Sequence, residues 1–344
     1  MDNEMNVEEK TPLLSVIVPT YNRKEMLSDA LKGILSQSLR DIEVIVVDDC
    51  SSDGTQDFMN DLKDKRIRYF RREKNTGVHY NYSLGLSNAQ GKYIVFHDDD
   101  DYYTDYEFFR KAVNIFSEHE DDTSPIVCVC SNALKLKIET NESERTYIGE
   151  PGRVKGTDFI LDGRKKYRKP ASLFPTVFRT ETLRQAGLGD DFMDDSETYW
   201  FAMLYGDAWF LADVIGVYRL HSESYTAGSK KNHQSYERRY KIVRERTKQR
   251  GIIYKKLCEI IGEKTARKFC TKAVYELVDF YGMQGKGFAD IFRIYRSILE
   301  VSDFMPELKY ILPLMRIAQL PRRIFRNVKF IRKFYRRIKY GNKV

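Results

Sequence analysis

Four consecutive aspartates, Asp98–Asp101, follow the apolar run Tyr93–Phe96 with a single histidine between them. The apolar run has the length and composition of a buried strand, so it would deliver four like charges to the edge of a core. Neighbouring carboxylates repel one another by roughly 1 kcal/mol in water and by more beside an apolar wall. We therefore expect a cationic group to lie against this segment.

Two further polar segments follow apolar runs in the same way. The sequence PTYNR comes after residues 13–18, and DDCSSDGT comes after residues 42–47. Ligands of open α/β sheets bind at the carboxyl ends of the parallel strands. All three polar segments should therefore converge on one edge of one sheet.

The elements that would place these segments alternate between strand and helix patterns. The expected strands lie at 13–18, 42–47, 67–70, 93–96 and 126–130, and the expected helices lie near 26–35, 55–63, 79–89 and 105–117. Such alternation predicts an α/β fold with a mostly parallel sheet. The expected strands are apolar almost throughout, which is typical of a sheet buried on both faces.

Composition indicates an ordinary globular protein. The 344 residues are 42% hydrophobic and 31% charged, enough for a large domain with an appendage. Five cysteines, an odd number, favour reduced thiols, and Cys128 and Cys130 share one face of an expected strand, where we expect core packing. The acidic N-terminus is unlike a signal peptide, and no apolar run reaches the roughly 18 residues of a spanning helix. These features predict a cytoplasmic protein.

The positive charge is concentrated at the C-terminus. Residues 316–344 carry 11 of the 58 Lys and Arg residues and no Asp or Glu, which leaves 47 basic against 50 acidic residues elsewhere. Apolar residues of this tail recur at helical spacing and form one stripe: Ile324, Val328, Ile331, Tyr335 and Ile338. The pattern is typical of an interfacial helix on an anionic membrane, with docking on its own domain or nucleic-acid binding as alternatives.

The pattern along the chain predicts four regions. Residues 1–12 are a flexible N-terminus, residues 13–225 form the main α/β domain, residues 226–315 are a helical region, and residues 316–344 are the basic tail. The boundary near 226 is placed where strand patterns stop and a helical pattern rich in Lys, Arg and Tyr begins.

Five segments in order resemble the family 2 glycosyltransferases. They read SVIVPTYNR, VIVVDDCSSDGT, GKYIVFHDDDDYY and FMDDSETYWFAML, followed by YRLHSES. The resemblance covers about residues 13–225 and leaves the last third of the chain unaccounted for. It implies a GT-A fold, which is a Rossmann-like nucleotide-sugar-binding domain, and the inverting transfer of a sugar from a nucleotide donor.

The resemblance gives the four aspartates a role. In the family, this position holds a DXD motif that binds a divalent cation and, through it, the donor diphosphate; Asp98, Asp99 and Asp100 occupy the triplet. It implies that Asp100 is a direct ligand and that Asp98 is a ligand or a ribose or water contact, and carboxylates suit Mg²⁺ or Mn²⁺. His221 matches a family histidine near the metal. A purely structural histidine is the alternative and has equal weight.

The first two polar segments correspond to the family's nucleoside site. The resemblance implies that Asp49, beside Asp48, reads the base. It also places Pro19, Thr20 and Tyr21 against the nucleoside, while Arg23 either meets a phosphate or faces solvent. Asp53 or Thr55 is expected only to cap the next helix, and Gly54 to form a turn.

The segment MDDSETYW resembles the family's acidic motif that carries the catalytic base. The resemblance implies that Asp195 takes the proton of the acceptor hydroxyl, and Asp194 stands where the family usually has glutamate. A helix N-cap at Asp194 and a favourable first-turn charge at Asp195 are the structural alternative, and the two roles can coexist.

One stretch departs from the family pattern. The family often has an Arg-Asn pair after GVSAA, whereas the sequence GVHYNYSLG has Tyr82 and Ser83 in those places. This departure leaves the phosphate-side contacts and the donor type open.

The resemblance therefore implies a metal-dependent inverting glycosyltransferase of bacterial surface polysaccharide synthesis, acting on a glycan or lipid-linked glycan. A nucleotidyltransferase is one rival, although PTYNRKE lacks the glycines of a phosphate loop. A nucleic-acid-binding protein that uses the basic tail is the second rival, although the acidic segments argue against nucleic acid in the main domain.

Overall fold

The computed structural model describes residues 11–162, 165–188, 195–222 and 236–266. The chain divides into two compact units, Met1–Lys231 and Asn232–Val344. In the second unit the described helix is α9, Tyr236–Ile261. The basic tail lies outside the described residues, and the four predicted region boundaries stay predictions.

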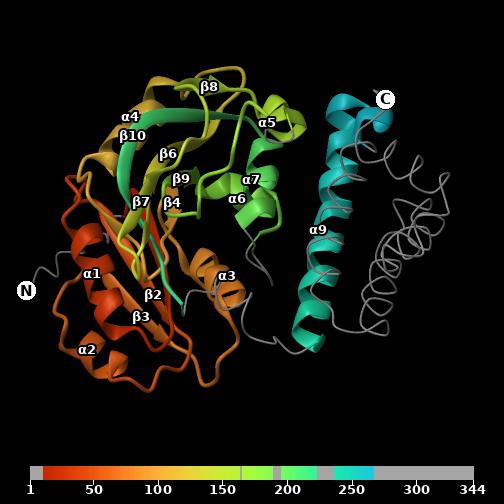
Figure 1. The fold of residues 1–344 in the computed structure, drawn as a ribbon. Helices are drawn as coiled ribbons and strands as arrows, with labels where there is room; N and C mark the ends of the chain where they lie inside the picture. The colour runs from red at the N-terminus through yellow and green to blue at the C-terminus, as the bar shows by residue number, and fades with distance from the viewer. Residues whose placement is uncertain (1–10, 163–164, 189–194, 223–235, 267–344) are drawn as a thin grey trace, which may run out of the picture. The chain divides into compact units, whose positions relative to one another are not determined.

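The first unit is an α/β layer structure built around one sheet (Figure 1). Its strand order is β3-β2-β1-β4-β9-β6-β10-β5, with β7 paired to β6 and β8 paired to β10. The strands β1 (Leu14–Thr20), β2 (Ile42–Asp48), β3 (Ile67–Arg71) and β4 (Tyr93–Phe96) are mutually parallel. This confirms the predicted fold class.

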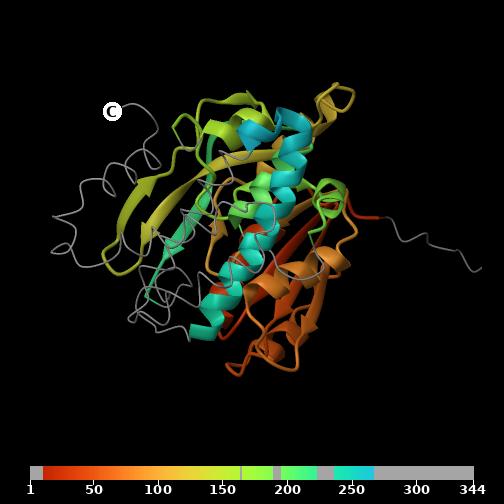
Figure 2. The same ribbon diagram turned by 90° about the vertical axis from the view of Figure 1, so that its right-hand side faces the viewer.

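The sheet is mixed in its second half. The strands β6 (Ile126–Lys137) and β10 (Asp207–Leu220) are parallel and run side by side, as Figure 2 shows. Between β4 and β6 lies β9 (Thr176–Arg179), antiparallel to both. The short strands β5 (Tyr102–Tyr103), β7 (Glu142–Arg145) and β8 (Gly152–Val154) add antiparallel edges.

Helices cover the two faces of the sheet. The helices α1 (Lys24–Leu35) and α3 (Val78–Asn88) lie on opposite faces (Figures 1 and 2). A Cβ at Gly85 would lie 2.1 Å from Cγ2 of Ile17, so a glycine is needed where α3 crosses β1. The remaining described helices of the unit are α2 (Thr55–Asp61), α4 (Phe108–Glu118), α5 (Gly156–Asp162), α6 (Thr180–Gln185) and α7 (Asp195–Met203).

The core forms where the predicted apolar runs meet. Every residue of β1, β2 and β4 is buried, and α4 adds Phe108, Phe109 and Phe116 to the same cluster. Cys128 and Cys130 are buried, with their sulfur atoms 3.8 Å apart, which confirms their predicted place in the core. Burial of these side chains fixes the ends of β1, β2 and β4, and those ends carry the polar segments.

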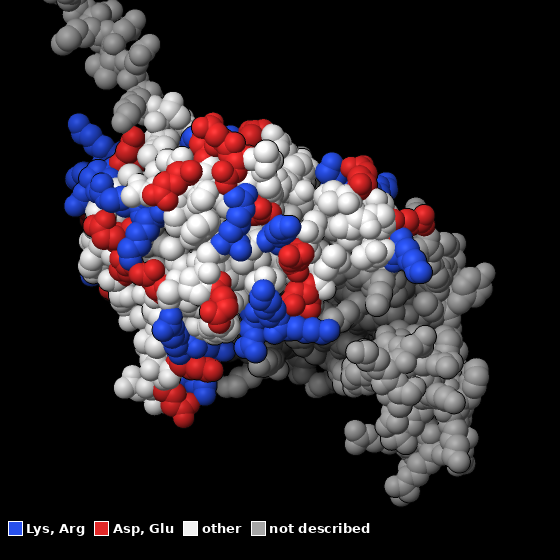
Figure 3. All heavy atoms as spheres, turned by 90° about the horizontal axis from the view of Figure 1, so that it is seen from above, with Lys and Arg blue, Asp and Glu red and all other residues white. Residues whose placement is uncertain are grey.

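Two observations concern membrane-spanning helices and the distribution of surface charge. In the described part of the chain, none of the helices combines the length and apolarity that crossing a membrane requires. Figure 3 shows one face of the molecule, on which basic and acidic side chains are interspersed.

Candidate active site

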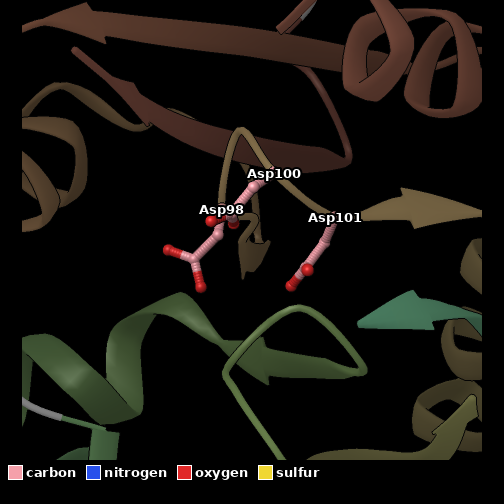
Figure 4. A group of neighbouring side chains, drawn as sticks. All are labelled: Asp98, Asp100 and Asp101. Atoms are coloured by element: carbon pink, nitrogen blue, oxygen red, sulfur yellow. The ribbon is translucent and has the colours of Figure 1, made fainter. Parts of the chain in front are cut away.

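The turn between β4 and β5 brings three carboxylates together. Asp98, Asp100 and Asp101 each offer an oxygen, and these oxygens all lie within 4.8 Å of one another. Figure 4 shows the three side chains projecting from this turn. We call these three residues the carboxylate cluster. Oxygen atoms so placed are the donor set that a hard divalent cation requires, so the residues present fit Mg²⁺ or Mn²⁺.

Asp99 is not part of the carboxylate cluster, and its side chain bonds instead to Thr20 and Arg23 at the end of β1 and just after it. Its Oδ2 accepts a hydrogen bond from Thr20 Oγ1 at 2.8 Å, and its Oδ1 accepts one from an Arg23 guanidinium nitrogen at 2.8 Å. The sequence prediction singled out Asp98–Asp100 and missed Asp101. A run of four identical residues carries no signal that tells which three side chains a tight turn will gather.

Two basic side chains, Arg23 and His221, lie against the aspartates. Arg23 donates to Asp100 Oδ2 at 3.0 Å, and His221 Nε2 lies 3.0 Å from the same oxygen. The Arg23 guanidinium forms ion pairs with Asp99 and Asp100, and its contact with a phosphate stays a prediction. His221 is buried beside the cluster, and its role at a metal stays a prediction.

Burial and crowding shape the charge of the aspartates. Burial, followed by the charge of Asp100, raises the pKa values of Asp98 and Asp101 well above their usual range. Burial also raises the pKa of Asp99 to about 6, against the opposing charge of Arg23. For Asp100, burial is outweighed by the His221 hydrogen bond and the Arg23 charge, so its pKa is lowered.

The end of β10 fastens the acidic turn. The backbone N–H of Arg219 donates to Asp101 Oδ1 at 3.0 Å, and Ser172 Oγ donates to Asp101 Oδ2 at 3.3 Å. Arg219 Nε donates to the backbone oxygen of Asp100, and its guanidinium lies 5.2 Å from the centre of the Tyr102 ring. The Arg219 contacts hold the turn from a strand more than a hundred residues away in sequence, and Ser172 adds a contact from the segment before β9.

The end of β2 lies on the same edge of the sheet but has a different chemistry. Asp49 Oδ1 accepts the backbone N–H of Thr76 at 2.8 Å, and Oδ2 accepts that of Gly77 at 2.7 Å. Asp48 Oδ1 accepts the N–H of Ser51 at 2.8 Å, and Oδ2 accepts the hydroxyl of Tyr69 at 2.6 Å. Asp49 thus shapes the loop before α3 in addition to any contact with a base.

The segment after β1 lies between the two acidic groups. Pro19 and Thr20 are buried in β1, whereas Tyr21 is 45% exposed, so its ring is accessible for packing on a planar ligand.

The predicted base stands at the first residue of α7. The Asp195 side chain is 38% exposed, and its Oδ2 lies 3.5 Å from Lys169 Nζ. Burial and the charge of Asp100 are the larger causes of the raised pKa of Asp98, and the charge of Asp195 is a further cause. Asp195 is therefore near enough to the cluster to affect it. Asp194 lies outside the described residues. Sequence reasoning did not find Lys169, which belongs to the run RKKYRK with no motif of its own.

Comparisons with known proteins agree with this geometry. Residues 15–171 match the family described as "Glycosyl transferase family 2". The chain is 26% identical over 303 residues to the GalNAc(5)-diNAcBac-PP-undecaprenol beta-1,3-glucosyltransferase of Campylobacter jejuni, covering 86% of this chain and 91% of that relative. It is 41% identical over 92 residues to the putative teichuronic acid biosynthesis glycosyltransferase TuaG of Bacillus subtilis, covering 26% of this chain and 36% of TuaG.

A solved structure shares the fold over most of the chain. The crystal structure of S. aureus TarS 1-349 is 19% identical and has a TM-score of 0.62, covering 94% of this chain and 91% of that one. At this identity the likeness concerns the fold alone.

Proposed function

We propose that this chain, whose residues 15–171 match glycosyl transferase family 2, transfers a sugar from a nucleotide-diphosphate donor to a glycan hydroxyl with inversion of the anomeric configuration. The observation that carries the proposal is the carboxylate cluster at the carboxyl end of β4, with Asp195 beside it. A cation site for the diphosphate and a separate carboxylate for the acceptor are the two parts that such a transfer needs.

The donor would lie along the edge formed by β1, β2 and β4. Asp98 and Asp100 would hold Mg²⁺ or Mn²⁺, with His221 next to Asp100, and the bound cation would act as a Lewis acid toward the leaving diphosphate. Asp49 would accept hydrogen bonds from the base, and Tyr21 would pack on it. Arg23 would keep Asp99 and Asp100 charged by its ion pairs.

Asp195 would perform the proton transfer. Its carboxylate would accept the proton of the acceptor hydroxyl while that oxygen forms a bond to the anomeric carbon of the donor sugar. On the opposite face, the bond from the anomeric carbon to the diphosphate oxygen breaks, and the electron pair leaves with the nucleoside diphosphate. Attack opposite the leaving group inverts the anomeric centre.

The acceptor is proposed to be a glycan, free or lipid-linked, of a bacterial surface polysaccharide. The Campylobacter relative is named for a lipid-linked glycan acceptor, and its alignment covers most of both chains. The basic tail is proposed to bind the anionic face of the membrane where such acceptors lie, because its 11 basic residues carry no acidic partner within residues 316–344.

The experiment is a panel of nucleotide sugars incubated with an acceptor extract, with and without Mn²⁺, in which released nucleotide is measured. We expect nucleoside diphosphate release with one donor type, and its loss in excess EDTA. Transfer at full rate in EDTA would contradict the metal, and release of pyrophosphate from a nucleoside triphosphate would favour a nucleotidyltransferase.

The membrane part is tested by sedimentation with vesicles. The full chain should bind vesicles containing anionic lipid at low salt and leave them at high salt, whereas a chain ending near residue 315 should not bind. Equal binding by both chains, or binding by neither, would contradict it. Salt-sensitive binding of the full chain to nucleic acid but not to vesicles would favour the other rival.

A further inference from the structure

Tyr82 on α3 contacts the carboxylate cluster from inside the protein. Its hydroxyl donates a hydrogen bond to Asp98 Oδ1, and its side chain is almost completely buried, with 4% of the residue exposed. The ring packs edge-on against Phe96 at 5.4 Å between centroids. Both ends of the contact are therefore fixed, the ring by the core and the carboxylate by β4.

The partner of Asp98 differs in kind from those of Asp99 and Asp100, which have basic partners. Arg23 pairs with Asp99 and Asp100, and His221 pairs with Asp100. Within the described part of the chain, no basic side chain lies within ion-pair distance of Asp98. A neutral hydroxyl orients this carboxylate without cancelling its charge.

We propose that Tyr82 is a positioning residue that holds the Asp98 carboxylate in the orientation in which it binds the divalent cation. This proposal rests on the proposed metal-dependent function. The hydroxyl donates to Oδ1, and among the described residues no hydrogen bond uses Oδ2 of Asp98. Without the hydroxyl, the buried carboxylate could rotate away from Asp100 to reduce the repulsion between them. Outer partners of metal ligands commonly change metal affinity about 10- to 100-fold when they are removed.

The test is the affinity of the full-length protein for Mn²⁺ alone, measured by calorimetry or by the electron paramagnetic resonance of free Mn²⁺. Tyr82→Phe keeps the ring and removes only the hydroxyl, so we expect a folded protein whose Mn²⁺ affinity falls about 10- to 100-fold. Circular dichroism and the unfolding temperature report whether the variant is folded.

The chain offers a matched control in Tyr69. Its hydroxyl also donates to a buried aspartate, Asp48, at 2.6 Å, but that aspartate belongs to the other acidic group. Tyr69→Phe removes the same chemical contact and should leave the Mn²⁺ affinity unchanged. An equal loss in both variants would mean a general effect on stability and would overturn the proposed role of Tyr82.

Kinetics separate positioning from a structural role. In Tyr82→Phe the KM of the donor should rise at limiting Mn²⁺ and return toward the wild-type value at saturating Mn²⁺, whereas general damage to the fold would not be rescued by metal. If Tyr82→Phe binds Mn²⁺ as the wild type does, the role of Tyr82 is wrong and the proposed function stands. If the wild type transfers sugar but binds no Mn²⁺, with or without UDP, both the metal site and this role fail.

Discussion

Two buried strands of the sheet lead into consecutive aspartates, and the two groups differ in what their carboxylates contact. After β2, Asp48 and Asp49 accept hydrogen bonds from a tyrosine hydroxyl and from the backbone N–H groups of nearby loops. After β4, Asp98, Asp100 and Asp101 turn their oxygens toward one another. The same sequence pattern has thus produced a loop-shaping group and a group of crowded carboxylates.

The difference teaches what to look for at the end of a buried strand. At the end of β2, the carboxylates of Asp48 and Asp49 accept hydrogen bonds from donors of the protein itself, and these bonds stabilise the fold. At β4 burial, followed by the charge of Asp100, raises the pKa values of Asp98 and Asp101. Buried carboxylates with raised pKa values are the ones to test for a ligand, and the ligand proposed here is a divalent cation.

The sharpest contrast should come from removing one charge of the cluster. Asp100→Asn should abolish Mn²⁺ binding and lower kcat/KM at least about 10³-fold, because a Lewis-acid cation contributes several kcal/mol to the transition state. Calorimetry and the rate of nucleotide release measure the two effects. A variant that keeps both properties would mean that the β4 group is no more a metal site than the β2 group.

Removing the charge of a carboxylate outside both groups should lower the rate of sugar transfer without changing the affinity for metal. Asp195→Asn should reduce kcat by about 10²- to 10⁴-fold, because the acceptor proton loses its base, while Mn²⁺ and donor affinities change little. Single-turnover transfer and Mn²⁺ titration of the same protein make the comparison. Near-normal kcat would move the proton transfer to another carboxylate, with Asp194 first.

Much of the first half of the sheet could be predicted from sequence, because its strands are short apolar runs buried on both faces. The run Tyr93–Phe96 is β4 with the same bounds, and Ile42–Val47 falls one residue short of β2. The antiparallel strand β9, of four residues, and β5, of two, were not predicted. Their conformation depends on pairing with distant strands, which local pattern does not report.

The place of several polar residues at one edge of the sheet could be predicted from the sequence, but their contacts could not. The aspartates, Thr20 and His221 do lie at one edge, since the carboxyl ends of parallel strands meet there. The ion pairs of Arg23 and the hydrogen bond of Tyr82 join segments more than fifteen residues apart, through side-chain directions that only the packed fold determines.

Stability should separate the two acidic groups. In Asp49→Asn an amide –NH₂ would face a backbone N–H at Thr76 or Gly77, so the free energy of unfolding should fall by about 1–3 kcal/mol. Asp98→Asn should leave the stability of the metal-free protein unchanged or higher, because it relieves repulsion. Urea unfolding in EDTA measures both. A larger loss in Asp98→Asn than in Asp49→Asn would reverse the comparison.

The smallest effect is expected at the last aspartate of the β2 segment. Asp53 accepts hydrogen bonds from Thr55 Oγ1 at 2.6 Å and from the N–H of Lys24 at 2.9 Å, so one carboxylate serves the first residues of α2 and α1. Gly54, at φ 84°, makes the predicted turn beside it. Although burial opposes the shift, these bonds lower the pKa of Asp53. Asp53→Ala should reduce the free energy of unfolding by about 1 kcal/mol at pH 7.

The pH dependence of that loss tests its cause. Because the pKa of Asp53 is lower in the folded than in the unfolded chain, its stabilisation is fully present above the ordinary aspartate pKa of about 4. It disappears as the pH falls through the folded value, so wild type and Asp53→Ala should converge in stability under acid. A difference that is the same at pH 7 and under acid would mean that Asp53 acts through packing. Asp53 would then not belong with the β2 aspartates whose charge accepts hydrogen bonds within the fold.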